Sequence, residues 1–302
     1  MRNLKRTLSL LLAVVMVIGL MVVGAGAVSY NDFSDRGEIV NKDAVSMLTT
    51  LGIIEGKPDG SYAPTEGVDR AQMAKMISTI KNNGSDNGAL YENVNSGLTD
   101  IVNHWAKGHI NYCYTTGIIA GRGNGIFDPN AGVTGTEAAK MLLVAIGYDP
   151  QIEGLVGTDW EINTNALATR LGIYRNFTKD VTQALNRDDA ALLIYNALDV
   201  EMIQQYQNGY ALAYEDHRTI LSSVYGVIRV EGVVAGNEWA QLQQTDSDAA
   251  LREGRTTLAN VVWYDSTTSN TRVEEGVKET EPVTFNVTTP VEYMGKAVTM
   301  YV

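Results

Sequence analysis

The sequence predicts a mainly α-helical N-terminal domain of three helix–loop–helix repeats, followed by a small antiparallel β domain. Three observations support this α + β multidomain organisation. A strong self-match recurs 65 residues on, as from Thr50 to Thr115, a weaker third copy follows, and short β-branched runs replace the helical spacing after about Gly209. The chain has 302 residues, 45% of them hydrophobic, which allows two modest folded domains. We divide it into a signal peptide, three repeats and the β domain at 1–27, 28–90, 91–150, 151–208 and 209–302.

The first 27 residues have the pattern of a secretory signal peptide. A basic start over 2–6 precedes an apolar run over 7–23 and small residues at 25–27. An uncleaved anchor is the alternative, because the run approaches the roughly 17 to 25 residues that cross a bilayer. The Ala-x-Ala ending favours cleavage after Ala27. We therefore expect an exported chain with no stable membrane insertion once the signal is removed.

Each repeat has the same physical plan. An amphipathic helix ends at a glycine, where a left-handed residue is needed, and a turn-rich loop leads to a second capped helix. One such unit cannot bury its own apolar faces, so three copies should pack together. The third loop is shorter, since Gly172 to Arg187 spans 15 residues where Gly52 to Arg70 spans 18. The glycines are Gly52, Gly117 and Gly172, and the caps are Asp69 with Gln72, Thr134 with Glu137 and Asn186 with Asp189.

The last hundred residues have the pattern of antiparallel strands. Their β-branched runs are short, and clusters of Gly, Asn, Asp, Ser and Thr separate them. The runs lie at 227–230, 233–234, 258–264, 282–287 and 297–302.

Charge and cysteine content narrow the classes of partner. With 23 Lys and Arg against 35 Asp and Glu, the net charge of −12 repels nucleic acid, so an anionic partner must be captured by local cations. The single cysteine, Cys113, excludes an intramolecular disulfide and is expected in the core. No catalytic constellation, cofactor motif or metal-ligand spacing is present in the sequence, so we expect no enzyme, cofactor or metal here.

The repeats resemble the S-layer homology family of bacterial surface proteins from Phe33 to about Val200. The second copy departs from the family pattern by placing Gly135 where the family has arginine, and the third keeps only Asp159-Trp160 of the opening motif. The matching motifs are Phe33-Ser34-Asp35, Leu98-Thr99-Asp100, His104-Trp105-Ala106, Gly117-Ile118-Ile119-Ala120-Gly121, Phe127-Asp128-Pro129-Asn130 and Val68-Asp69-Arg70-Ala71-Gln72.

The resemblance implies a pseudo-threefold bundle in which three repeats form grooves between them. Family members bind secondary cell-wall polysaccharide in these grooves, often through pyruvate ketals, and some assemble with other S-layer subunits. The resemblance further implies that the protein is located at the cell wall or S-layer. The polysaccharide-binding candidates that it suggests are Asp35, Arg70, Asp100, Trp105 and Arg187.

Two of these candidates are arginines at the start of a second helix. Arg70 and Arg187 each follow a cap, where the helix dipole disfavours a cation by a few tenths of a kcal/mol. A carboxylate docked on the free N–H groups would turn each arginine into a clamp. The alternative is a surface ion pair with an acid such as Glu66 or Asp188. Because Gly135 replaces the arginine of the second copy, we expect that copy's groove to have lost its clamp.

Two further alternatives stay open at the level of sequence. Trp105 could stack on a sugar face or occupy a core or interface position with its N–H satisfied. The leading hypothesis for the chain is a non-catalytic wall-binding module. The others are a wall-anchored enzyme, such as a hydrolase with its catalytic domain beyond residue 302, and a lattice subunit.

Overall fold

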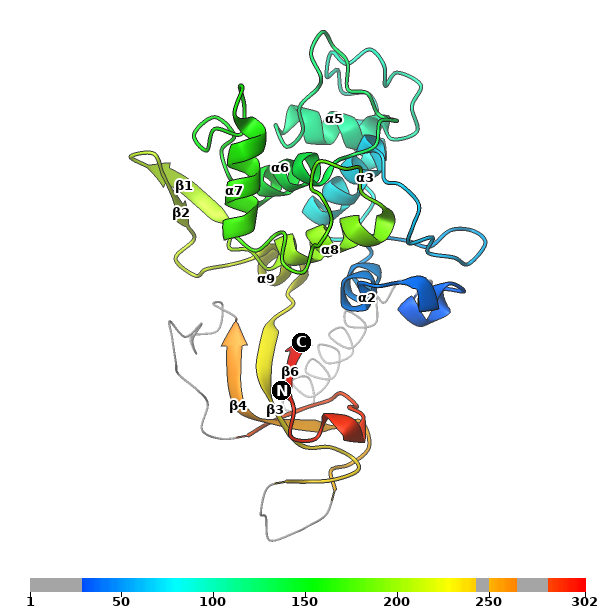
Figure 1. The fold of residues 1–302 in the computed structure, drawn as a ribbon, viewed down its shortest axis with the longest axis vertical. Helices are drawn as coiled ribbons and strands as arrows, with labels where there is room; N and C mark the ends of the chain where they lie inside the picture. The colour runs from blue at the N-terminus through cyan, green and yellow to red at the C-terminus, as the bar shows by residue number, and fades with distance from the viewer. Residues whose placement is uncertain (1–28, 243–249, 265–281) are drawn as a thin grey trace, which may run out of the picture.

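The computed structural model describes residues 29–242, 250–264 and 282–302, so the predicted signal peptide lies outside the described residues. Within those ranges, no helix combines the length and apolar character needed to cross a bilayer. A helical part lies above a four-stranded sheet in the view of Figure 1, which confirms the predicted α + β architecture. The helices are α2 (Lys42–Thr50), α3 (Arg70–Lys81), α4 (Gly88–Tyr91), α5 (Lys107–Thr115), α6 (Gly135–Ile146), α7 (Trp160–Arg170), α8 (Arg187–Leu198) and α9 (Ile220–Tyr225), with short 3-10 turns at Tyr30–Asp32, Arg36–Glu38 and Val291–Tyr293.

The glycines after the first helix of each pair adopt the predicted left-handed conformation. Their φ angles are +70° at Gly52, +76° at Gly117 and +77° at Gly172. An L side chain is strained in this region, whereas glycine is not. The three helices α2, α5 and α7 therefore end just before the predicted positions.

The caps of the second helices follow the predicted pattern, with one difference. Asp69 and Thr134 each form a reciprocal pair with the residue three positions on. Asn186 accepts a hydrogen bond from the Asp189 amide at 2.8 Å, but the Asp189 side chain does not return it. Its carboxylate pairs with Lys179 at 2.5 Å instead.

The three segments that precede these caps form a closed ring of backbone hydrogen bonds. The Val68 amide donates to the Leu185 carbonyl at 2.9 Å, Leu185 donates to Val133 at 2.9 Å, and Val133 donates to Val68 at 3.0 Å. All three side chains are buried. Each repeat thus contacts both of the others at this point, and one core runs through all three helix pairs.

Cys113 lies in that core, as its sequence predicts. It is fully buried in α5, and burial raises the pKa of its thiol to about 12. The group is therefore an uncharged apolar filler at neutral pH.

The C-terminal part contains the predicted strands, together with a helix that was not predicted. Residues 203–227 form the β1–β2 hairpin and α9, which pack on the helical core, and α9 begins at a capping pair of Thr219 with Ser222. The sheet has the antiparallel order β5-β4-β3-β6 and its own core of Val230, Val234, Leu258 and Val261. The strands are β1 (Ile203–Gln207), β2 (Tyr210–Ala213), β3 (Arg229–Gly236), β4 (Thr256–Tyr264), β5 (Val283–Phe285) and β6 (Ala297–Tyr301).

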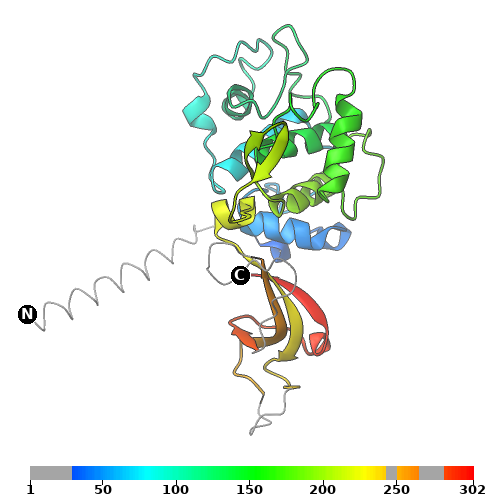
Figure 2. The same ribbon diagram turned by 90° about the vertical axis from the view of Figure 1, so that its left-hand side faces the viewer.

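Two polar contacts join the sheet to the helical part. The hydroxyls of Tyr195 on α8 and Tyr301 on β6 lie 2.7 Å apart, and Arg229 on β3 forms an ion pair with Asp199. Figure 2 shows the sheet beneath α2 and α8, on the side away from α5. The third repeat and α2 therefore form the surface on which the sheet rests.

Candidate functional site

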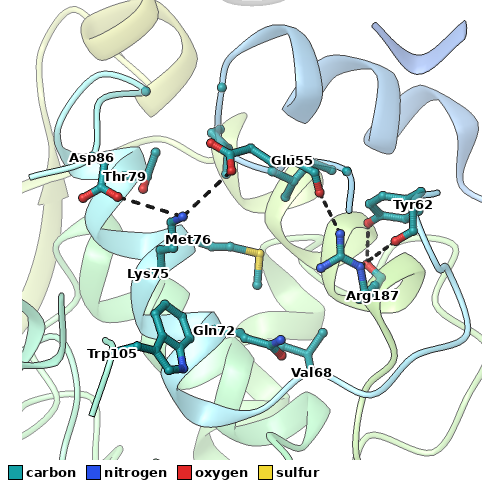
Figure 3. Close-up of a pocket in the computed structure, with 15 residues that line it drawn as sticks. Glu55, Tyr62, Val68, Gln72, Lys75, Met76, Thr79, Asp86, Trp105 and Arg187 are labelled. Atoms are coloured by element: carbon teal, nitrogen blue, oxygen red, sulfur yellow. Dashed lines mark hydrogen bonds and ion pairs between the residues drawn. The ribbon is translucent and has the colours of Figure 1, made fainter. Parts of the chain in front are cut away.

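A cavity of about 230 Å³ lies beside α3, and we call it the first groove (Figure 3). The first repeat forms its walls through the turn after α2 and the exposed face of α3. The second repeat contributes Trp105 and the third contributes Arg187. The lining residues are Gly52, Ile53, Ile54, Glu55, Gly56, Tyr62, Val68, Gln72, Lys75, Met76, Thr79, Gly84, Asp86, Trp105 and Arg187.

Arg187 crosses from the start of α8 to the loop of the first repeat. Its Nε donates to the Tyr62 carbonyl at 2.7 Å and its Nη2 donates to the Glu55 carbonyl at 2.8 Å. The guanidinium carbon lies 4.7 Å from the centroid of the Tyr62 ring. Among the described residues, none accepts a hydrogen bond from Nη1. One edge of this half-buried guanidinium therefore remains for a ligand.

Arg70 makes the same crossing from the first repeat to the second. Its Nε donates to the Phe127 carbonyl at 3.0 Å and its Nη2 to the Ala120 carbonyl at 2.9 Å, with the Phe127 centroid 4.5 Å away. Here Nη1 is also engaged, at 3.3 Å from Glu137. The residue is only 4% exposed, and desolvation lowers the pKa of its guanidinium. Arg70 is therefore a buried connection between repeats and lies outside the first groove, so carboxylate binding by it stays a prediction.

This crossing changes which loop the absence of an arginine at Gly135 affects. Each arginine reaches the loop of a neighbouring repeat, so the loop of the second repeat receives Arg70 and the loop of the first receives Arg187. The loop of the third repeat receives no arginine from a neighbour, while the loss of a carboxylate clamp in the second copy's groove stays a prediction. A Cβ at residue 135 would lie 3.0 Å from both Cα and the carbonyl oxygen of Val181. The shortened third loop thus occupies the space that a side chain would need.

Asp35 and Asp100 hold the loops that carry the two stacking rings. Asp35 accepts from the amide of Tyr62 at 2.8 Å and from that of Ala63 at 2.7 Å. Asp100 does the same for Phe127 at 3.0 Å and Asp128 at 2.7 Å. Neither carboxylate lines the first groove. Each positions an aromatic ring under an arginine, and direct contact with polysaccharide stays a prediction for both.

Trp105 lies at the rim of the first groove with 59% of its surface exposed. The core alternative for this residue is therefore wrong. Figure 3 shows the indole beside α3, across the groove from Arg187. An exposed ring in this place presents a flat apolar face to whatever enters.

Lys75 is a groove residue that the motif comparison missed. Its Nζ lies 4.0 Å from Glu55 and 3.9 Å from Asp86, and its side chain is 34% exposed. Its equivalent in the second repeat, Lys140, lies with Nζ 4.9 Å from the centroid of Trp160. The signal was present in the sequence, since a lysine recurs on the polar face of two second helices.

Comparison with known proteins finds a family model that matches two segments of the chain. The model of the S-layer homology domain matches residues 32–74 and 97–139, which run from each opening aspartate motif into the second helix. A cell surface protein of Thermoanaerobacter kivui is 27% identical over 100% of this chain and 35% of its own length. A middle cell wall protein of Brevibacillus brevis is 28% identical over 68% of this chain and 18% of its own length. An S-layer protein of Bacillus licheniformis is 31% identical over 40% of this chain and 13% of its own length.

The chain therefore spans about a third, or less, of the length of these relatives. The alignment with the Thermoanaerobacter kivui protein extends over the whole chain, the residues of the sheet included. Residues 32–74 and 97–139 accordingly match the S-layer homology domain, and the chain as a whole is similar to a bacterial cell surface protein.

Proposed function

We propose that this chain attaches non-covalently to the bacterial cell wall by holding a wall polysaccharide in the first groove. The observation that carries the proposal is the convergence of Trp105, Lys75 and Arg187 on one cavity from three different repeats. The attachment is non-catalytic, and the exported chain resides at the cell wall or S-layer. The words cell surface, cell wall and S-layer in the names of the relatives support this location.

The proposal includes a pseudo-threefold bundle of three repeats, the third being divergent. The closed ring through Val68, Leu185 and Val133 supports it, because equivalent residues bond in cyclic order. The exchange of arginines between neighbouring repeats supports it as well. A groove between repeats is then a property of the assembled bundle, and a single repeat would lack it.

The polymer that suits the first groove carries a carboxylate, such as a pyruvate ketal, close to a sugar ring. Trp105 offers the sugar a stacking surface. Lys75 and the free edge of Arg187 offer the carboxylate a positive charge and a planar donor. The net charge of the chain is −12, so these local cations carry the recognition of any anionic polymer. Secondary cell-wall polysaccharide is the proposed partner, and other S-layer subunits are a further one.

A second candidate is attachment of an enzyme by the same groove. A cell wall amidase of Bacillus anthracis is 30% identical over 36% of this chain, and Exoglucanase XynX of Acetivibrio thermocellus is 28% identical over 57%. The aligned part makes up only 19% and 16% of those proteins. In this reading the repeats have the same binding role, and the catalytic part lies in additional sequence.

The test is co-sedimentation of residues 28–302 with sacculi that carry their polysaccharide, with sacculi freed of ketal pyruvate, and with sacculi stripped of polymer. We expect retention on the first only. Trp105→Ala should weaken retention at least about fivefold, because a stacked ring contributes on the order of 1–3 kcal/mol. Trp239→Ala is the matched control, since that tryptophan is 65% exposed but lies after β3 in the sheet region. Equal retention on stripped sacculi would overturn the proposal.

A further inference from the structure

A buried histidine lies directly behind the first groove. His109 on α5 is 5% exposed, and its Nε2 lies 3.2 Å from Oδ1 of Asp86. The other oxygen of Asp86 lies 3.9 Å from Nζ of Lys75, which lines the groove. Asp86 therefore connects a titratable ring in the interior with the ammonium group that lines the groove. Figure 3 shows the contact between Asp86 and Lys75.

Two glycines bring the Asp86 segment this close to α5. A Cβ at Gly108 would lie 1.8 Å from the carbonyl oxygen of Gly88, and a Cβ at Gly88 would lie 2.7 Å from Nε2 of His109. The Gly88 amide also donates to Asp86 at 2.9 Å, which fixes the direction of the carboxylate. The approach of α4 to α5 depends on both residues lacking a side chain.

The protons of this cluster can be assigned in only a few ways. Oγ of Ser78 lies 2.6 Å from Nδ1 of His109 and 2.9 Å from the carbonyl oxygen of Lys75. A hydroxyl has one proton, so beside a neutral ring that is protonated on Nε2 it serves only one of these acceptors. A neutral ring protonated on Nδ1 instead leaves Nε2 without a proton beside Asp86. When the ring holds both protons, Nδ1 donates to Ser78, Ser78 donates to the carbonyl, and Nε2 donates to Asp86. The cationic ring thus satisfies every polar atom of the cluster.

Charged groups face His109 from each element packed on α5. Lys75 approaches from α3, Asp86 from the segment before α4, and Glu92 from the end of α4. Glu92 also pairs at 3.9 Å with Lys107 on the helix of His109 itself. Desolvation lowers the pKa of His109, while Asp86 acts in the opposite direction. The ring is therefore neutral at pH 7.5 and gains its second proton as the pH falls.

We propose that the Asp86–His109 pair regulates the first groove, so that protonation of His109 neutralises Asp86, releases Lys75 and tightens the binding of an anionic wall polymer. This inference rests on the function proposed above. At pH 7.5, Asp86 and Glu55 both hold Lys75 and repel an incoming carboxylate. Once the ring is protonated, Asp86 is held by the imidazolium and Lys75 turns to the ligand. Binding and protonation then favour each other reciprocally.

The test measures Kd of residues 28–302 for soluble polysaccharide released enzymatically from the sacculi that retain the chain. The wild type should bind about fivefold more tightly at pH 5.5 than at pH 7.5, the lower end of typical coupling between two sites. His109→Gln should bind with the same Kd at both values. Asp86→Asn should bind at pH 7.5 as tightly as the wild type does at pH 5.5. His217→Gln, which changes a histidine beside Glu201, should keep the full fivefold effect.

The histidine resonances give an independent measurement, because the chain has only three histidines. Added polysaccharide should raise the pKa of His109 and leave the resonances of His217 in place. A wild type that binds equally at both pH values, or a His109→Gln variant that keeps the fivefold difference, would overturn the regulation while leaving attachment intact. If the wild type binds at neither pH value, the proposed attachment is wrong, and the proposed regulation is wrong with it.

Discussion

The guanidinium of Arg70 stacks on Phe127 at 4.5 Å and donates to the carbonyl oxygen of the same residue at 3.0 Å. The two residues belong to different repeats, and both are buried. Arg70 lies at the start of a helix, where the sequence suggested that it binds an anion. In the structure it joins two neighbouring repeats. Arg187 is the equivalent residue in the third repeat and makes the same kind of contact. Its Nη1 edge, however, remains available to a ligand.

Arg70→Ala should lower the free energy of unfolding by about 3 kcal/mol, because a buried charged group that satisfies two carbonyls and one carboxylate is removed. Glu137 keeps Arg122 as a partner at 3.1 Å, which limits the loss. Urea unfolding measures the change. Arg252→Ala, at an exposed position, is the control. If Arg70→Ala instead unfolds like the wild type and only polysaccharide binding is lost, the structural role assigned here is wrong.

Introducing the family arginine at Gly135 should destabilise the protein. The smaller change Gly135→Ala already places a Cβ 3.0 Å from the backbone of Val181, so an overpacking cost of about 1–3 kcal/mol is expected. Thermal unfolding measures it. Gly37→Ala is the matched control, because nothing lies within 4 Å of a Cβ there. Equal stability of both alanine variants would show that the third loop moves aside.

Most of the helical architecture could be predicted from the sequence, because the residues that start and end each helix lie close together in the chain. Helix caps at Asp69 and Thr134 and the left-handed Gly52 depend on residues within a few positions. The direction of Arg70 was not accessible, since its acceptors at Ala120 and Phe127 lie in another repeat and no periodicity describes that contact. The short helix α9 was missed because its six residues are too few to show a helical period.

Lys75→Gln should weaken polysaccharide retention by about tenfold, since a neutral amide cannot replace the ammonium facing a carboxylate. Stability should change by less than about 0.5 kcal/mol, because the side chain is a partly exposed surface group. Retention on sacculi and thermal unfolding together test both statements. Lys42→Gln on α2, outside the first groove, should be retained like the wild type. Loss of retention in both variants would indicate non-specific electrostatic binding.

The unliganded protein should lose stability as the pH falls below about 6.5, and His109 should account for part of the loss. Its folded-state pKa is lowered by desolvation, so the unfolded chain binds more protons in this window and acid favours unfolding. One such group gives a slope of at most about 1.4 kcal/mol per pH unit. Urea unfolding of wild type and His109→Gln at several pH values isolates it. Parallel stability curves for the two proteins would contradict the assignment.

Tyr301→Phe should loosen the sheet from the helical part. The change removes the 2.7 Å hydrogen bond to Tyr195, at a cost of about 1 kcal/mol. Hydrogen exchange should increase at β6 and α8 while α3 stays protected. Tyr293→Phe, on a partly exposed ring in the sheet region, is the control. Unchanged exchange at β6 would show that the Tyr195–Tyr301 hydrogen bond does not hold the two parts together.

The ring of bonds through Val68, Leu185 and Val133 has a consequence for how such a domain can evolve and fold. A linear array of repeats tolerates gain or loss of a unit, because each unit touches only its neighbours. A ring closed at three does not, because removing or adding one leaves an amide and a carbonyl unpaired at its centre. Closure also joins the first repeat to the third across more than a hundred residues, so the last repeat must be present before the first is complete. In the three-repeat bundle proposed above, copy number is therefore set by this geometry, and the divergent third segment is needed to close the circle.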